Sequence, residues 1–222
     1  MLNFLENPVW NALNSTHAGL ALGTDGCKRY PADVAPFLAV ADAGQAVTQG
    51  NPGEALTFVG VVPACPAGWT VELDARLLQM VADGPVEARS ITPAAVALGE
   101  ADAQAMLDLT AIAFPGYFRA RTHVLGTYLG VRVDGRLVAM AGERMAIGRL
   151  REVSGVCVHP DFLGRGYARH LVARLQNQHA EQGLTSFLHV SPENAGAIKL
   201  YETLGFARHA TVALQRLHIP AL

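Results

Sequence analysis

The chain has 222 residues, of which 50% are hydrophobic and 16% are charged, and its formal net charge at pH 7 is -2. This composition supplies enough apolar surface for a real core, so we expect a folded globular protein. No run of Lys or Arg stands out, and the net charge is slightly negative. Both features argue against nucleic acid as a partner.

The amino terminus and the cysteines indicate the compartment. The first residues, MLNFLENPVW, hold an acid and a proline where a signal peptide would have basic residues and then an apolar run. No apolar stretch approaches the roughly 20 residues of a membrane-spanning helix. Cys27, Cys65 and Cys157 are widely separated, and the histidines show no HExxH spacing. We therefore expect a cytoplasmic protein without a membrane anchor, a disulfide framework or a metal.

The first part of the chain is interrupted by turn-forming residues, as in LGTDGCKRYPADVAP, and its apolar runs are short. The stretch over residues 82–93, ADGPVEARSITP, is poor in large apolar residues and closes on a proline. Such composition is typical of a domain boundary. The sequence thus predicts an amino-terminal α+β lobe of unassigned role over residues 1–88 and a second domain over residues 89–222.

The second domain has clearer local signals. Apolar residues recur at helical intervals over residues 101–113, which predicts a helix. The next two runs, TYLGVRV and RLVAMAGERMAI, flank Asp134-Gly135, a pair that tolerates the positive φ angles of a type I′ turn. They predict a hairpin, and residues 151–158 predict a third strand that ends at His159-Pro160.

The segment VSGVCVHPDFLGRGYARHLVARLQ has the pattern strand, glycine-containing loop, helix. Gly164 and Gly166 would let the backbone turn tightly and present consecutive N–H groups at a helix start, where the macrodipole also favours anions. This arrangement predicts a pyrophosphate site. Arg169 stands at the third glycine position of the dinucleotide fingerprint, and no Gly-Lys-Ser/Thr follows, so neither that fingerprint nor a P-loop is present. The alternative interpretation is a tight turn that only allows close packing.

A second helix is predicted in SPENAGAIKLYETLGF, after the strand pattern LTSFLHV. Gly205 followed by Phe206 is typical of a helix end with a left-handed C′ residue. Asn194 and Tyr201 share one face and lie about 10 Å apart along the axis. Asn194 could therefore bond the amides of a ligand while Tyr201 reaches its reactive end. The alternative is an N-capping asparagine and a packed tyrosine.

Taken together, VCVHPDFLGRGYA and NAGAIKLYETLGF resemble the motifs of the GNAT superfamily of N-acetyltransferases, nearest the glycine N-acyltransferase-like branch. The resemblance covers residues 89–222. It implies an α+β fold with a mixed, mostly antiparallel central sheet flanked by helices, and acetyl-CoA as cosubstrate. One departure is Leu163, which replaces the family's Gln or Arg at the head of the loop motif. Because backbone amides make most phosphate contacts, this departure predicts weakened cofactor binding and not its loss.

The resemblance also implies positions for the cofactor. Backbone groups of the third strand would hold the pantetheine arm, the loop amides would hold the pyrophosphate, and the second helix would complete the site. The implied cofactor-binding residues are Val156, Cys157, Val158, Leu163, Gly164, Arg165, Gly166, Tyr167, Ala168, Asn194 and Tyr201. The Cys157 side chain itself is interpreted as a small buried apolar group.

Acetylation of an amine needs a base to take a proton from the ammonium group, and the leaving thiolate benefits from an acid. Tyr201 is the acid that the family position implies. Glu152 is the favoured base, because it lies on the strand that leads into the loop and resembles in position the general-base glutamate of the histone-acetylating branch. Strand alternation would place it on one side with Ser154, Val156 and Val158.

Glu143 is the second candidate base. Alternation would place it among small and apolar side chains, where partial desolvation would raise its pKa. These neighbours are Ala139, Ala141, Met145 and Ile147. Either glutamate could instead be a strand carboxylate that pairs with Arg144 or Arg151.

The sequence thus predicts transfer of acetyl from acetyl-CoA, by direct attack, to a primary amine of a small molecule or a protein. The alternatives are a longer acyl-CoA donor, an amino-acid acceptor, and a CoA-binding sensor that has lost turnover. The open edges of a mixed sheet would allow a homodimer.

Overall fold

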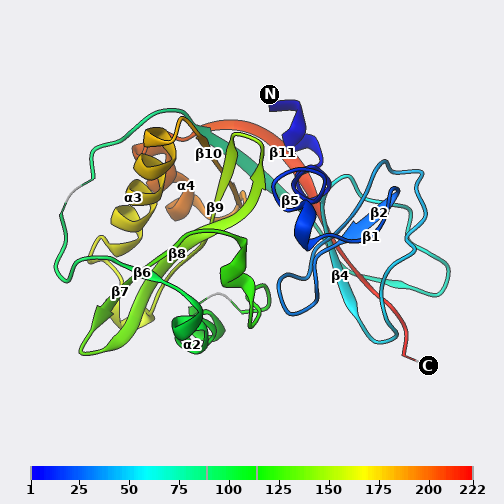
Figure 1. The fold of residues 1–222 in the computed structure, drawn as a ribbon, viewed down its shortest axis with the longest axis horizontal. Helices are drawn as coiled ribbons and strands as arrows, with labels where there is room; N and C mark the ends of the chain where they lie inside the picture. The colour runs from blue at the N-terminus through cyan, green and yellow to red at the C-terminus, as the bar shows by residue number, and fades with distance from the viewer. Residues whose placement is uncertain (1, 89, 114, 222) are drawn as a thin grey trace.

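The computed structural model describes residues 2–88, 90–113 and 115–221. Its main feature is an eight-stranded sheet with the order β4-β11-β5-β10-β9-β8-β7-β6 (Figure 1). Strands β9 and β10 run parallel, whereas the other neighbours in this sheet run antiparallel. The predicted mixed, mostly antiparallel sheet is therefore confirmed. The strands are β4 (Ala55–Gly60), β5 (Thr70–Ala82), β6 (Val96–Leu98), β7 (Tyr128–Val133), β8 (Arg136–Ile147), β9 (Leu150–Val158), β10 (Thr185–Val190) and β11 (Ala207–His218).

The amino-terminal part of the chain is joined to this sheet. Strands β4 and β5 precede the predicted boundary, yet β5 lies between β10 and β11 and pairs with both. Two strands from before the predicted boundary thus belong to the same sheet as the later strands. The first residue after the predicted boundary, Arg89, lies outside the described residues. The remaining elements before β4 are η1 (Leu2–Glu6), α1 (Pro8–Leu13), η2 (Ala18–Leu20) and a three-stranded sheet of β1 (Leu22–Thr24), β2 (Cys27–Arg29) and β3 (Leu38–Val40).

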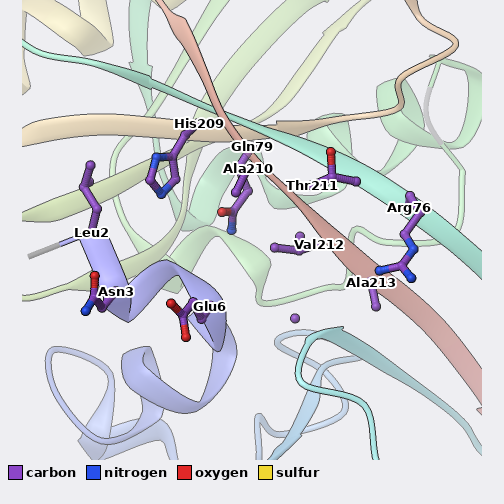
Figure 2. A pocket seen from close by; sticks show the side chains of 11 residues that line it. Leu2, Asn3, Glu6, Arg76, Gln79, His209, Ala210, Thr211, Val212 and Ala213 are labelled. Carbon is purple, nitrogen blue, oxygen red and sulfur yellow. The ribbon is translucent and has the colours of Figure 1, made fainter.

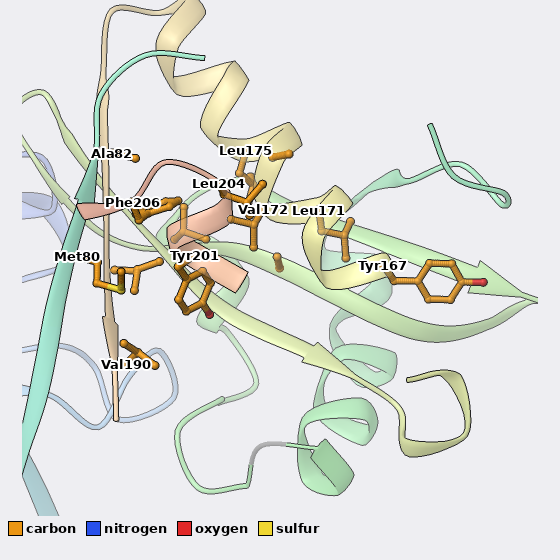
Figure 3. Close-up of a cluster of buried hydrophobic side chains, with 14 of the residues drawn as sticks. Met80, Ala82, Tyr167, Leu171, Val172, Leu175, Val190, Tyr201, Leu204 and Phe206 are labelled. Carbon is orange, nitrogen blue, oxygen red and sulfur yellow. The ribbon is translucent and has the colours of Figure 1, made fainter. Parts of the chain in front are cut away.

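Helices cover both faces of the large sheet. On one face, α3 (Tyr167–Glu181) and α4 (Ala195–Thr203) bury Leu171, Leu175 and Ile198 against the strands (Figure 3). On the other face lie α1 and α2 (Ala103–Ala113), with separate apolar clusters. The helix predicted over 101–113 is present as a short 3-10 turn, η3 (Glu100–Asp102), followed by α2. No helix among the described residues has the length and apolar character needed to cross a bilayer.

The predicted hairpin and helix ends are confirmed. Asp134 and Gly135 have φ angles of 49° and 80°, and they join β7 to β8 as a type I′ turn requires. After α4, Gly205 has a φ of 83°, and the Phe206 N–H donates to the carbonyl of Tyr201 at 3.0 Å. These local signals succeeded because each depends on a backbone conformation that few residues adopt.

Two β-bulges between β8 and β9 change the faces that simple alternation predicts. Gly142 pairs with Ser154 and Met140 pairs with Cys157, so Gly155 and Val156 together oppose a single residue of β8. Gly155 has a φ of 60°, a left-handed conformation that glycine adopts without strain. Val156 and Val158 consequently pack toward α3 and α4, on the face opposite to Glu152. The predicted common side for these residues was wrong.

The second bulge lies at Arg144 and Met145, which together oppose Glu152 on β9. Glu143 faces α3, as its contact with His179 shows, and it shares that face with Ala139 and Ala141. Two of its predicted neighbours, however, lie in the cluster on the α1 face, namely Met145 and Ile147. An extra residue in a strand reverses every side chain beyond it.

Candidate active site

Strands β9 and β10 form a fork. They pair at three positions, Leu150 with Thr185, Arg151 with Ser186, and Glu152 with Phe187. Beyond this point β9 continues along β8 to Val158, while β10 continues along β5 to Val190. The facing edges of β9 and β10 therefore have no ladder partner in the described sheet after Glu152. An unpaired strand edge offers N–H and C=O groups to an extended ligand that carries amides.

The loop after β9 presents backbone groups to solvent. Gly164 and Gly166 have φ angles of 76° and 79°, and α3 begins directly after Gly166. A Cβ placed on either glycine would meet no atom of the described residues within 4 Å. The glycines therefore do not serve close packing, which was the alternative interpretation. An open loop at the start of a 15-residue helix fits a phosphate group, because the amides and the helix dipole both favour an anion.

The side chains on either side of Gly164 are exposed. Leu163 is 65% exposed, and the guanidinium of Arg165 lies 4.7 Å from the ring centre of Phe162. Tyr167 and Ala168 form the first turn of α3, with Tyr167 buried. The exposed leucine at the head of the loop adds no charge to the site.

Helix α4 holds the other two predicted cofactor residues. Asn194 is the N-cap of α4, and its side-chain oxygen accepts a hydrogen bond from the Ala197 N–H at 3.0 Å. Tyr201 is buried against Phe206, and burial raises its pKa to about 12. The structural alternatives for both residues are thus present. They leave the Asn194 amide nitrogen and the protonated Tyr201 hydroxyl as donors, and Figure 3 shows that hydroxyl pointing away from α3.

Cys157 lies between Val156 and Val158 on β9, but its side chain faces α2 and not α3. Its neighbours include Leu137 and Met140, and burial raises the pKa of its thiol to about 12. The thiol is therefore protonated at neutral pH. This agrees with the expected small buried apolar side chain.

Glu152 is fully buried in a network of side chains. Arg144 donates to both carboxylate oxygens, at 2.9 and 2.5 Å, and His189 Nδ1 lies 2.7 Å from Oε1. Burial alone would raise the pKa of this carboxyl, but the charges and hydrogen bonds of Arg144 and His189 outweigh it and hold the pKa at about 2. Pairing with Arg144 was one of the sequence alternatives, and it is present.

The network continues across the sheet to the amino-terminal segment. His189 Nε2 lies 2.9 Å from Gln79 Nε2, and the same Gln79 nitrogen donates to the carbonyl of Leu5 at 2.7 Å. Because Gln79 Nε2 is a donor, His189 Nε2 accepts and its Nδ1–H donates to Glu152. Arg144, Glu152, His189 and Gln79 thus form a row across β8, β9, β10 and β5. We call these four residues the buried row, and its Glu152–His189 contact links β9 to β10 where their backbone pairing ends.

Glu143 has a separate set of partners. His179 Nε2 lies 3.0 Å from its Oε1, and His179 Nδ1 lies 2.8 Å from the hydroxyl of Ser186. The Glu143 side chain is 13% exposed, whereas that of Glu152 is not exposed. Burial is the largest single effect and raises the pKa of Glu143, but the hydrogen bond and charge of His179, together with the Thr127 backbone and the charge of Arg151, outweigh it, so the net direction is down. The predicted rise was wrong because the sequence did not reveal His179 as a partner.

Sequence reasoning missed the residues that surround the two glutamates. Gln79, His179, Ser186 and His189 come from β5, α3 and β10, far from β9 in the chain. They belong to no motif, and only strand alternation in LTSFLHV could have placed two of them on particular faces. No group of three or more His, Cys, Asp or Glu among the described residues could hold a metal ion.

Comparisons with known proteins agree with this geometry. The model of the Acetyltransferase (GNAT) family matches residues 97–206. A solved structure from Novosphingobium aromaticivorans, described as an acetyltransferase from the GNAT family, is 39% identical, has a TM-score of 0.88, and aligns over 96% of this chain and 97% of its own. That alignment includes most of residues 1–88, so the amino-terminal part is shared with this relative.

Two curated relatives match a smaller part. N-alpha-acetyltransferase RimI of Mycobacterium tuberculosis is 33% identical over 124 residues, which are 50% of this chain and 77% of that protein. The [Ribosomal protein bS18]-alanine N-acetyltransferase of Salmonella typhimurium is 35% identical over 82 residues, 36% of this chain and 55% of that protein. This chain therefore spans about half of the second relative. Both relatives lie outside the glycine N-acyltransferase-like branch that the sequence suggested.

Proposed function

The chain belongs to the GNAT family of acetyltransferases and is an acyl-CoA-dependent N-acetyltransferase, and from this premise we propose a site and an acceptor class. The reaction takes place at the fork between β9 and β10, by direct attack of a primary amine on the thioester of acetyl-CoA. The observation that carries the proposal is the fork that leads to an open glycine loop at the start of α3. A protein with a purely structural role would need neither the fork nor the open glycine loop.

Acetyl-CoA fits the groups that the structure presents. The Leu163 N–H donates to the Pro160 carbonyl, so the amides of Gly164 to Ala168 would bind the pyrophosphate, and the free edge of β9 from Val156 to Val158 would bind the pantetheine amides. The Asn194 side-chain nitrogen would add a donor beside them. These contacts use backbone groups almost throughout, so they do not depend on the positive charge that Leu163 lacks.

Tyr201 is proposed as the acid. During transfer, a C–N bond forms between the neutral amine and the acetyl carbonyl, the C–S bond of the thioester breaks, and the departing sulfur takes the Tyr201 hydroxyl proton. The proton that the attacking nitrogen loses as it becomes an amide then restores the Tyr201 hydroxyl. A phenol with a pKa of about 12 stays protonated at neutral pH and so has that proton to give. The Tyr201 ring is buried in the apolar cluster that includes residues of α3 and α4.

Glu143 is proposed as the group that takes the proton from the ammonium form of the acceptor. Glu152 was the favoured base in the sequence, but both of its oxygens are occupied, and a carboxyl with a pKa of about 2 holds a proton poorly. Glu143 keeps partial solvent exposure and is ionised at neutral pH. Glu152 then has a positioning role, because it links β9 to β10 through His189.

The proposed acceptor is the α-amino group at the start of a polypeptide. The support comes from the two curated relatives, which are named for acetylation of such groups. A small-molecule amine is the competing acceptor class, because α1 packs on one face of the sheet and the two relatives align with only 50% and 36% of this chain. The two classes differ in the size of acceptor that must approach the fork.

The experiment measures thiol release from acetyl-CoA with peptides that carry a free α-amine, the same peptides with a blocked α-amine, lysine peptides, polyamines and aminoglycosides. We expect release with free α-amine peptides, and Tyr201→Phe should lower kcat by about 10²–10⁴ while the Kd for acetyl-CoA stays unchanged. Unreduced turnover in Tyr201→Phe would contradict the acid. Release with polyamines or aminoglycosides alone would contradict the acceptor class.

The two glutamates are compared in the same assay. Glu143→Gln should lower kcat and remove the acidic limb of the pH–rate profile, since the acceptor of the proton is then missing. Glu152→Gln should lower kcat without moving that limb. If Glu152→Gln removed that limb and Glu143→Gln did not, Glu152 would be the base.

A further inference from the structure

A cavity lies away from the loop and helix α4, between η1 and the strands β4, β5 and β11 (Figure 2). Its volume is about 420 Å³, within the range of small-molecule sites. We call it the η1 pocket. Apolar contacts come from side chains on η1 and β11, namely Leu2, Ala210, Val212 and Ala213. The polar side chains that line it are Asn3, Glu6, Arg76, Gln79, His209 and Thr211.

Two side chains of opposite charge line the η1 pocket and do not pair with each other. Figure 2 shows Glu6 on η1 and Arg76 on β5 at opposite sides of it, with Gln79 between them. Within residues 2–88, 90–113 and 115–221, neither Glu6 nor Arg76 forms an ion pair. Charged groups that line a concave site and have no protein partner are available to a ligand.

The floor of the η1 pocket is a buried polar group. Gln79 is 1% exposed, and its Nε2 is used by Leu5 and His189. No hydrogen bond from the described part of the chain reaches its Oε1. A carbonyl oxygen that lines a concave site can accept a hydrogen bond from a ligand. Gln79 therefore adds a polar group to the two charges that line the pocket.

A glycine on β4 and a bulge on β11 shape the walls of the η1 pocket. Gly60 has a φ of 89°, and a Cβ there would lie 2.2 Å from the Glu6 carbonyl oxygen, so glycine lets η1 rest against the end of β4. His209 is an extra residue between the ladder positions of Arg208 and Ala210 on β11. A bulge of this kind redirects a side chain, and here His209 lines the pocket.

We propose that the η1 pocket binds a small molecule that carries both a cationic amine and a carboxylate, of the size of an amino acid or a dipeptide. Arg76 binds the carboxylate, Glu6 binds the ammonium group, and Gln79 Oε1 accepts a hydrogen bond from it. The apolar residues of β11 contact the side chain of the ligand. This site goes beyond the acetyl transfer proposed above and does not require it.

The test is isothermal titration calorimetry of the full chain without acetyl-CoA. The probes are L-leucine and L-alanyl-L-leucine, with their N-acetyl and C-amide derivatives. We expect a zwitterionic probe to bind, and we expect loss of either charge to weaken binding by about tenfold or more, as for a charge-assisted hydrogen bond. Absence of binding by both zwitterionic probes at millimolar concentration would overturn the proposal.

Two variants assign the charges. In Arg76→Met, the C-amide and the free acid should bind equally, while N-acetylation still weakens binding; in Glu6→Gln the opposite pattern is expected. Arg208→Met and Glu202→Gln are matched controls, since they remove one charge of each sign from an exposed pair outside the pocket. Equal effects of pocket and control variants would overturn the site. A parallel titration with acetyl-CoA reports the cofactor site separately, so failure of one proposal does not imply failure of the other.

Discussion

Toward its carboxyl end, β9 and the following loop present backbone groups, and the side chains there turn to a core or to solvent. Toward its amino end, the same strand presents Glu152, which side chains from β8 and β10 hold in place. The first arrangement depends on the absence of a Cβ at Gly164 and Gly166, and the second depends on the presence of particular charges. One strand thus joins a ligand site made of main chain to a support made of side chains.

The largest expected effect concerns the buried row. Glu152→Gln removes the carboxylate from Arg144, whose side chain is only 15% exposed. Removal of one partner from a buried pair leaves an uncompensated charge, so the free energy of unfolding should fall by about 3–5 kcal/mol. Urea denaturation measures this change.

The matched control is Glu202→Gln, which breaks the exposed pair of Glu202 with Arg208. Exposed pairs contribute little, so this loss should be about 0–1 kcal/mol. If both substitutions cost the same, the buried row does not support the fork in the way described.

The pH dependence of the free energy of unfolding also tests the buried ion pair of Glu152. The pKa of Glu152 is about 2 in the folded chain and is ordinarily 4.5, so the folded state favours the ionised form. A lowered pKa contributes stability above the ordinary value and loses it as pH falls toward the folded value. The difference in unfolding free energy between the native chain and Glu152→Gln should therefore be constant above about pH 5 and shrink below it. A difference that does not change down to about pH 3 would contradict the ion pair.

Local signals in the sequence were sufficient for much of the fold. Asp134-Gly135 predicted the hairpin and Gly205 predicted the end of α4, because each position needs a positive φ. The glycine loop was located for the same reason. These features are set by neighbours in the chain, so a single sequence contains them.

Long-range pairing was not predictable in this way. Strands β5 and β11 were not identified, although they have 13 and 12 residues, because their pairing joins segments more than a hundred residues apart. Gly155 lay visibly within a predicted strand, where an isolated glycine indicates a bulge. The prediction assumed strict alternation through Gly155. It therefore placed Glu152 on the same face as Val156 and Val158, which is wrong. His189 and His179 were missed because only the folded sheet brings them to the glutamates.

The loop end of β9 is tested by a substitution that adds one methyl group. Gly166→Ala should cost about 1–2 kcal/mol of stability, because alanine is strained at positive φ. It should also weaken acetyl-CoA binding by about tenfold or more, since the new Cβ occupies the space that the phosphate needs.

Gly135→Ala separates these two effects. Gly135 has a φ of 80°, against 79° at Gly166, and a Cβ at either position meets no described atom within 4 Å. The strain should therefore be equal, but Gly135 lies in the hairpin turn and its substitution should leave the Kd for acetyl-CoA unchanged. Equal weakening by the two substitutions would show that the loop does not bind the phosphates.

The smallest expected effect restores a charge to the head of the loop. Leu163 is 65% exposed, so Leu163→Arg should leave stability unchanged while it places a cation beside the proposed phosphate site. An exposed charge pair contributes about 0–1 kcal/mol, which predicts acetyl-CoA binding tighter by about twofold to fivefold at low salt. The gain should disappear at high salt because the charges are then screened. Leu163→Gln has similar polarity without the charge and should show no salt-dependent gain. A gain of equal size in both variants, insensitive to salt, would mean that the loop gains a hydrogen bond at this position and that the charge adds nothing.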